Sequence, residues 1–240
     1  MEVMKVVKSD PSAKAEWGKW RRQITPKIGQ LTNDPQEINR IVRLTPLCSG
    51  QSRNLCLQST QLMNIVNPPN GTPHNQIIYT ALLSSLAKAV ILQAETEVTA
   101  EKRSAGPLAH VTFTLLDNID SFPEVFFARL VQRVGGWPIP LIVPRTDYNG
   151  ANWETDKVRW KAMGYRKSTV SDDVEGAVEY TTRVAGVMRV YFHILQIRPV
   201  QRPLKPMFQA HRLWVWVARL MGDSALLVTV VAAQLLYSES

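Results

Sequence analysis

Cysteine and histidine are scarce in this sequence of 240 residues. It contains two cysteines, Cys48 and Cys56, and four histidines. No Cys-x-x-Cys pair and no cysteine and histidine spacing of a zinc site occurs, so the sequence predicts neither a metal site nor a disulfide scaffold. Unpaired cysteines are typical of a reducing compartment, which excludes the class of small secreted proteins held together by disulfides.

Catalytic motifs are also missing. The sequence has no P-loop, no dinucleotide-binding glycine pattern and no nucleophile elbow. Glu95 and Glu97, like Asp172 and Asp173, are close in sequence, but these spacings place the two carboxylates on different faces of a helix. Neither pair therefore predicts acid–base catalysis. The sequence has no candidate catalytic residue and favours a binding or regulatory module over an enzyme.

Long hydrophobic runs are rare as well. The N-terminus lacks the apolar core of a signal peptide. The most apolar stretch, Leu213 to Tyr237, is interrupted at residues 222–224, and neither half reaches the roughly 20 apolar residues of a membrane span. We therefore predict two buried helices there and no membrane insertion.

The sequence does have a basic excess, with a formal net charge of +8 and an isoelectric point near 9.7. Such a charge favours anionic partners, which include nucleic acid, phosphorylated small molecules, an acidic protein face or an anionic membrane surface. Hydrophobic residues make up 45% of the chain, which is typical of a packed globular protein. The charge alone leaves the kind of anion open.

Helical periodicity dominates the pattern. Residues 76–98 contain no glycine or proline, and their apolar residues recur at spacings of three and four, which predicts the strongest helix. The same signals, with Ser121–Glu124 as a capping box and Asp172-Asp173 as a cap, predict further helices at residues 35–42, 108–116, 122–134, 153–163 and 174–197. Strand alternation is scarce, so we predict an all-α fold, either a helical solenoid or an irregular bundle.

The expected domain organisation has three parts. Residues 1–15 are polar and are expected to form a flexible N-terminal segment. Residues 16–240 are expected to form one helical domain, in which Pro26 limits any helix that runs through it. Residues 44–75 contain several turn-forming residues and are expected to be an irregular insert.

Several basic residues lack an acidic neighbour on their own helix. Arg129 and Arg133 are four residues apart, and no Asp or Glu lies three or four residues from either; Gln132, a neutral donor, lies between them. Lys88 and Arg21 also lack such a neighbour. Positions of this kind suit an external anion, because arginine and lysine bind phosphate oxygens well. Acidic residues distant in sequence are the alternative partners.

Five groups of segments, in order along the chain, resemble one family. They are Ile24–Asn33, similar to a P-K-x-G-Q-L-T-N stretch; Leu86–Val90 with Gln93–Val98; Pro107-Leu108 with Phe127–Val131; Met163–Arg166 with Gly186–Tyr191; and Trp214–Leu220. Together they cover most of residues 17–221, and they resemble the C-terminal domain of the Gle-one family of mRNA export factors.

The resemblance implies an all-α, HEAT-like fold without catalytic activity. It implies inositol hexakisphosphate as a regulatory ligand and a DEAD-box RNA helicase as the partner whose ATPase cycle and RNA release the domain stimulates, so that messenger ribonucleoproteins are remodelled. An FG nucleoporin and translation initiation factors are further implied partners, with RNA contacted only indirectly. The implied location is the nucleus, at the cytoplasmic face of the nuclear pore complex, and the cytoplasm. Because the family continues for several more helices, the resemblance implies a C-terminally truncated copy.

The family's inositol-phosphate residues correspond to Arg21, Lys88, Arg129, Gln132 and Arg133. These include the basic residues that lack a local acid. Two positions depart from the family, because Leu92 and Gln132 stand where basic residues are usual. We therefore expect a weakened anion site.

Two alternative functions remain at this point. One is nucleic-acid binding by a basic helical module, in which the aromatic and basic run Trp17–Arg22 stacks on bases and contacts phosphates. The other is a scaffold role within the nuclear pore.

Overall fold

Helices form almost all of the regular structure. The computed structural model describes residues 2–29, 53–69, 71–135, 146–147, 149–168, 173–199 and 202–222. Its helices are α1 (Glu2–Ser9), α2 (Pro11–Gly29), α4 (Arg53–Val66), α5 (Gln76–Ala100), α6 (Ala105–Asn118), α7 (Phe122–Val134), α8 (Asp156–Ala162), α9 (Ala177–Gln196) and α10 (His211–Gly222), with 3-10 turns η1 (Lys102–Ser104) and η2 (Pro206–Phe208). Within these ranges the only β-type pairings are two isolated bridges. The predicted all-α fold is confirmed.

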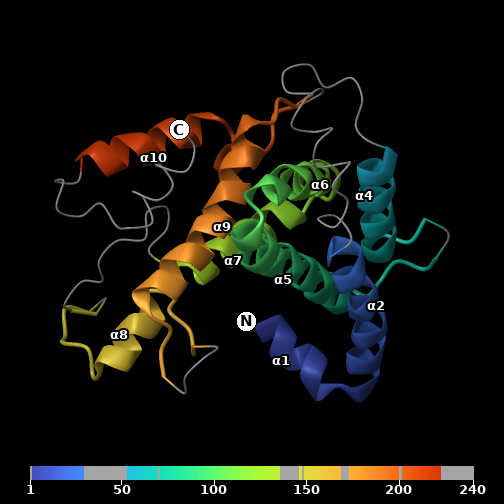
Figure 1. Ribbon diagram of the computed structural model, residues 1–240. Helices are drawn as coiled ribbons and strands as arrows, with labels where there is room; N and C mark the ends of the chain where they lie inside the picture. Colours follow the sequence, from blue (N-terminus) through green and yellow to red (C-terminus); the bar gives the residue numbers. More distant parts are fainter. Residues whose placement is uncertain are drawn as a thin grey trace.

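Helix α5 is the centre of the arrangement. Figure 1 shows it in the middle of the molecule, where it contacts α1, α2, α4, α6, α7 and α9. Its start is capped by Asn75, whose side chain accepts a hydrogen bond of 3.1 Å from the Ile77 backbone N–H. Helix α5 is long and apolar enough to cross a membrane, but its apolar side chains, such as Leu82, Leu86 and Val90, form the core of this fold.

The crossing of α5 and α9 depends on one glycine. A Cβ atom at Gly186 would lie 2.4 Å from the Ala94 carbonyl oxygen and 2.7 Å from the Thr99 hydroxyl. Because both distances are far below van der Waals contact, a larger side chain would force the two helices apart. Gly186 therefore fixes how closely α9 approaches the helix that carries the core.

The first fifteen residues differ from the flexible segment that the sequence predicted. Of these, residues 2–15 form α1 and the first turns of α2, and the Val7 side chain is fully buried. Helix α2 also continues through Pro26 to Gly29. The proline lies in the last two turns, so it disturbs few backbone hydrogen bonds, and the burial of Ile24 and Ile28 on either side offsets that cost.

The predicted irregular insert is only partly irregular. Helix α4 occupies residues 53–66 and packs Leu55, Leu62 and Val66 into the core, whereas residues 67–69 and 71–75 are non-helical as expected. Burial of one helix face outweighed the weak local signal. Residues 44–52, the predicted helix at 35–42 and the second half of the apolar C-terminal stretch lie outside the described residues.

Several helix ends also differ from the predicted ones. The Ser121 side chain makes no capping hydrogen bond, although α7 begins at Phe122 and ends at Val134 as predicted. Helix α9 begins at Ala177 after Gly176, three residues later than predicted. Helix α8 begins at Asp156, because the Thr155 hydroxyl accepts a hydrogen bond from the Val158 N–H. These differences move helix boundaries and leave the order of helices unchanged.

Candidate functional site

A basic pocket of about 760 Å³ lies between α1, α2, α5, α7, α8 and the segment after α8. No Asp or Glu is among its lining residues. Seven basic side chains line it: Lys8, Arg21, Lys88, Arg129, Arg133, Lys161 and Arg166. We call this cavity the basic pocket. Its volume is in the range of small-molecule sites, and its charge suits a ligand with several negative groups.

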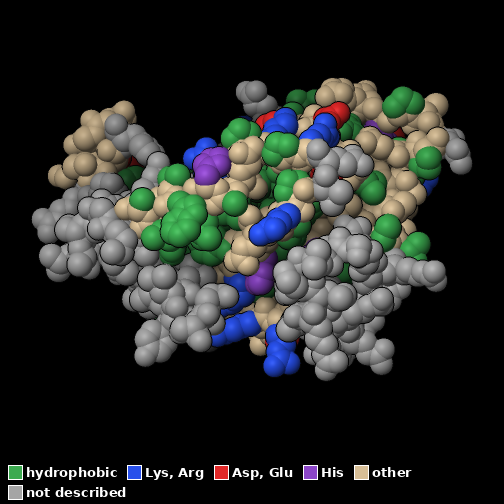
Figure 2. Space-filling model, turned by 90° about the horizontal axis from the view of Figure 1, so that it is seen from above, with side chains coloured by type: hydrophobic (Ala, Val, Ile, Leu, Met, Phe, Trp, Pro, Cys, Tyr) green, Lys and Arg blue, Asp and Glu red, His purple; other side chains and the backbone are tan. Residues whose placement is uncertain are grey.

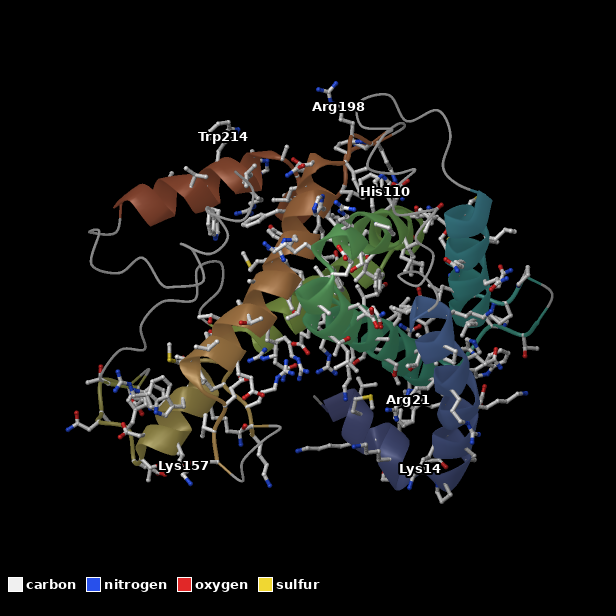
Figure 3. All side chains as sticks on the ribbon, in the orientation of Figure 1. Lys14, Arg21, His110, Lys157, Arg198 and Trp214 are labelled. Atoms are coloured by element: carbon white, nitrogen blue, oxygen red, sulfur yellow. The ribbon has the colours of Figure 1, made fainter. Side chains whose placement is uncertain are left out.

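All five residues that the sequence singled out line this pocket. Arg21 comes from α2, Lys88 from α5, and Arg129, Gln132 and Arg133 from α7. Figure 3 shows Arg21 projecting from α2 toward α1 and α5, which are two other walls of the pocket. The structure therefore brings together residues that lie up to 112 positions apart in sequence, from Arg21 to Arg133.

One face of α5 forms the floor of the basic pocket. Ser84, Lys88 and Leu92 are four residues apart, so they lie in a row along the helix. Lys88 is exposed, and Leu92 is 42% exposed. An apolar side chain thus lines the pocket one helical turn from Lys88, which is the position where the family resemblance leads one to expect a basic residue.

Arg129 is held in place by neutral partners. Its Nε donates to the Ser84 hydroxyl at 3.2 Å and its Nη2 donates to the same oxygen, while its Nη1 donates to Gln132 Oε1 at 2.7 Å. No carboxylate pairs with Arg129 in the described part of the chain. Because neutral acceptors fix the guanidinium without cancelling its charge, Arg129 is oriented and still attractive to an anion.

Arg133 has a partner that its local sequence does not reveal. Its Nε and Nη2 donate to the two carboxylate oxygens of Glu95, at 2.7 and 2.6 Å. Arg166 also forms two hydrogen bonds with this carboxylate, one of them 3.0 Å long, and Arg183 Nη1 lies 3.4 Å from it. For Arg133 the alternative that the sequence left open therefore applies, because an acid distant in sequence, Glu95 on α5 and 38 residues away, supplies its counter-charge.

Glu95 is the buried centre of this cluster. Its side chain is 3% exposed, whereas those of Arg133 and Arg166 are 30% and 26% exposed and reach the pocket. Burial raises the pKa of the Glu95 carboxyl above its ordinary value, and hydrogen bonding and charge from Arg133 and Arg183 oppose that rise. Arg183 also pairs with Glu175. Three arginines and two glutamates leave one net positive charge, so this wall is less basic than its arginine content suggests.

Two glycines place Arg166 at the pocket. Gly135, which ends α7, has a φ of +65°, and a Cβ atom there would lie 1.9 Å from the Met163 carbonyl oxygen. Gly164 has a φ of +85° and faces the same junction. Tyr180 joins both sides, because its hydroxyl donates to the Val134 and Met163 carbonyl oxygens at 3.0 and 3.2 Å.

The Tyr180 hydroxyl remains a donor over the whole physiological range. Burial is the main cause that raises its pKa, and the neighbouring Tyr165 hydroxyl adds to the rise. The ring of Tyr165 stacks on that of Tyr180 with centroids 3.9 Å apart. Tyr165, which precedes Arg166, is thereby fixed on α9, so the approach of Arg166 to Glu95 follows from packing.

The two aromatic residues of α2 both make contacts inside the fold. Trp17 is 7% exposed, and its indole N–H donates to the Ser85 hydroxyl at 3.0 Å. The Arg21 guanidinium lies over the Trp17 ring at 5.0 Å. The Trp20 ring contacts the His74 ring edge to face, with centroids 5.2 Å apart. Trp17 therefore serves internal packing, whereas Trp20 is partly exposed, and nucleic-acid contact through this run stays a prediction.

Sequence reasoning missed three of the seven basic residues. Lys8 lies in the segment predicted to be flexible. Lys161 and Arg166 also have no Asp or Glu three or four residues away, so the signal that marked the other basic residues was present for them too. Arg166 lies in addition in one of the segments that resemble the Gle-one family. No group of three metal-ligating side chains occurs in the described part of the chain.

The fold and the pocket define a helical domain with a basic cavity that suits a multiply charged anion. The sequence pattern of the GLE1-like protein family matches residues 1–238, and the chain belongs to this family. The mRNA export factor GLE1 of Saccharomyces cerevisiae is 28% identical over 196 residues, which are 82% of this chain and 31% of that protein. Its counterpart in Schizosaccharomyces pombe is 29% identical over 178 residues, 74% of this chain and 31% of that protein. The chain thus spans less than a third of the length of these relatives.

Solved structures that contain Gle1 are also similar to this chain. A complex described as the S. cerevisiae Dbp5 L327V C-terminal domain bound to Gle1 H337R and IP6 is similar with a TM-score of 0.73 and 26% identity, over 98% of this chain and 70% of that one. A second complex, of the same Dbp5 domain with Gle1 and IP6, has a TM-score of 0.71 and 23% identity, over 99% of this chain and 74% of that one, and supports the fold alone.

Proposed function

We propose that this chain binds inositol hexakisphosphate in the basic pocket and activates a DEAD-box RNA helicase of mRNA export. One observation carries the proposal: Arg21, Lys88, Arg129, Gln132 and Arg133 come from three helices and line one pocket without an acid. The lysines and arginines can donate charge-assisted hydrogen bonds to phosphate oxygens, and the Gln132 amide adds a neutral donor. The similar Gle1 chain was solved with IP6 and a Dbp5 domain, which supports both the ligand and the partner.

In this proposal the domain acts by binding and performs no chemistry of its own. The ligand lies in the pocket with part of its phosphates facing outward, so it can also attract basic residues of the helicase. The helicase then completes its ATPase cycle faster and releases RNA, which remodels the messenger ribonucleoprotein at the cytoplasmic face of the nuclear pore complex. An FG nucleoporin and translation initiation factors are proposed as further partners from the family resemblance.

Helicase stimulation tests this proposal directly. The RNA-dependent ATPase rate of S. cerevisiae Dbp5, or of the helicase from the same organism as this chain, is measured with the chain and increasing inositol hexakisphosphate. We expect stimulation by the chain that increases with the ligand. No stimulation at any ligand concentration would contradict the activator role. Stimulation that is the same with and without ligand would keep the activator role and remove the ligand from it.

Leu92 offers a gain-of-function prediction. Leu92→Arg places a guanidinium on the pocket face of α5, one turn from Lys88, and one additional charge-assisted contact is expected to tighten inositol hexakisphosphate binding by about tenfold. Repulsion between the two cations costs only a few tenths of a kcal/mol. The dissociation constant is measured by titration calorimetry at fixed salt concentration.

The matched control is Leu57→Arg on α4, because Leu57 is 58% exposed and lies outside the basic pocket. It makes the same change in net charge. If both variants tighten binding equally, the effect belongs to net charge and the assignment of Leu92 to the ligand site is wrong.

A further inference from the structure

Two short helices at the edge of the fold each bring one lysine into the basic pocket. Lys8 is in α1, which has eight residues, and Lys161 is in α8, which has seven. We propose that Lys8 and Lys161 bind ligand phosphates, and that the bound polyanion thereby fastens α1 and α8 to α5. This inference rests on the proposed function. The proposed function concerns how the ligand links the domain to the helicase, whereas the inference concerns how the ligand stabilises two helices within the domain.

Neither lysine has another partner for its charge. Both side chains are exposed, and neither pairs with an acid within the described ranges. Lys157, one turn before Lys161 on α8, differs: its ammonium lies 3.2 Å from the Asp173 carboxylate, outside the pocket. On α1, Lys5 is exposed and does not line the pocket. Each helix therefore has one lysine that faces the cavity and one that does not.

The two helices also bury few side chains of their own. Among its described side chains, α1 buries only Val7, and α8 buries none. Helices of this length are not stable in water by themselves, so they depend on tertiary contacts. Figure 1 shows α1 and α8 below α5, at the lower edge of the molecule. A contact from each helix to a shared ligand would add to the small burial that holds it.

Electrostatic repulsion makes the positions of α1 and α8 depend further on a bound ligand. Lys8 and Lys161 converge with Lys88 and Arg129 in a cavity without acids, so in the absence of a ligand these cations repel one another. Moving α1 or α8 away from α5 relieves the repulsion. A polyanion in the pocket reverses the sign of the interaction and favours the closed arrangement.

Titration calorimetry with inositol hexakisphosphate tests the two lysines in the whole chain. We expect Lys8→Gln and Lys161→Gln each to weaken binding by about tenfold, the loss of one charge-assisted contact. The controls Lys5→Gln and Lys157→Gln make the same charge change on the same helices and are expected to remain within about twofold of the unchanged protein. All four side chains are exposed, and circular dichroism checks that each variant is folded.

Hydrogen exchange provides a readout of the helices themselves. With ligand bound, backbone amides of α1 and α8 are expected to exchange more slowly, while those of α4, which does not line the pocket, are expected to be unchanged. If the unchanged protein binds the ligand but the pocket variants match their controls, the inference is overturned and the proposed function stands. If the unchanged protein does not bind the ligand, the proposed function falls and the inference falls with it.

Discussion

Replacing Glu95 by alanine is expected to lower the free energy of unfolding by about 3 kcal/mol. The substitution leaves Arg133, Arg166 and Arg183 without the carboxylate on which they converge. The expected cost is at the low end of the range for buried ion pairs for two reasons. Arg133 and Arg166 are partly exposed and can turn toward water, and Arg183 keeps Glu175 as a partner. Chemical denaturation monitored by circular dichroism measures the change.

The matched control is Glu97→Ala, on the same helix and with the same loss of charge. Glu97 is partly exposed and has no ion-pair partner among the described residues, so its replacement is expected to cost less than about 0.5 kcal/mol. If the two variants are equally stable, the three arginines do not depend on Glu95. Inositol hexakisphosphate is expected to restore part of the stability lost in Glu95→Ala, because the ligand provides negative charge next to Arg133 and Arg166.

The double variant Lys88→Gln, Arg129→Gln is expected to weaken inositol hexakisphosphate binding by about 100-fold, since each side chain contributes about one charge-assisted contact. Lys88 is exposed on the floor of the pocket, and Arg129 is fixed by Ser84 and Gln132 with its charge uncompensated. Neither of the two substitutions breaks an ion pair in the described structure, so we expect the fold to be retained. Titration calorimetry at fixed salt concentration measures the affinity.

A second double variant, Lys102→Gln, Arg103→Gln, separates the pocket from the overall charge. Both residues are exposed in η1 and lie outside the basic pocket. Each double variant lowers the formal net charge from +8 to +6. An equal loss of affinity in both would mean that the ligand responds to net charge and that the pocket is not its site. Arg133 is a poorer choice for this test, because its removal also disturbs Glu95.

The sequence predicted the helices with strong internal periodicity and missed those that depend on their neighbours. Helices α5 and α7 were predicted nearly to the residue, because an apolar stripe, the absence of internal glycine and a clear final glycine are local properties. Helices α1 and α4 were not predicted. Their local signals are weak, and what stabilises them is the burial of a few side chains, such as Val7 and Leu62, against elements distant in sequence.

In the candidate site, too, several residues with a local signal were predicted and the contacts that depend on packing were not. Charge spacing and the family resemblance indicated Arg21, Lys88 and Arg129, and the structure places them in one cavity. The partner of Arg133 could not be predicted, because the contact of Glu95 with Arg133 and Arg166 is made only when α5, α7 and the segment after α8 meet. Lys8 and Lys161 could not be predicted either, since their position depends on how two short helices pack.

The outer face of the molecule contrasts with the basic pocket. Figure 2 shows the face that carries α10, where hydrophobic side chains lie exposed among polar ones. Figure 3 shows Trp214 pointing away from the rest of the fold, and it is 73% exposed, whereas Trp216, two residues on, is 4% exposed and packs against Phe192. The described part of α10 thus has one face in the core and one outside it.

The acid-free lining of the basic pocket has a consequence for laboratory work with this domain. Any small anion that occupies the cavity stabilises the folded state in proportion to the logarithm of its concentration. Phosphate or sulfate in a buffer can therefore raise the melting temperature and also compete with an added ligand, whereas chloride mainly screens the lysines and arginines. A melting temperature or a dissociation constant of this domain describes the protein and its buffer together, and values from different buffers are not interchangeable.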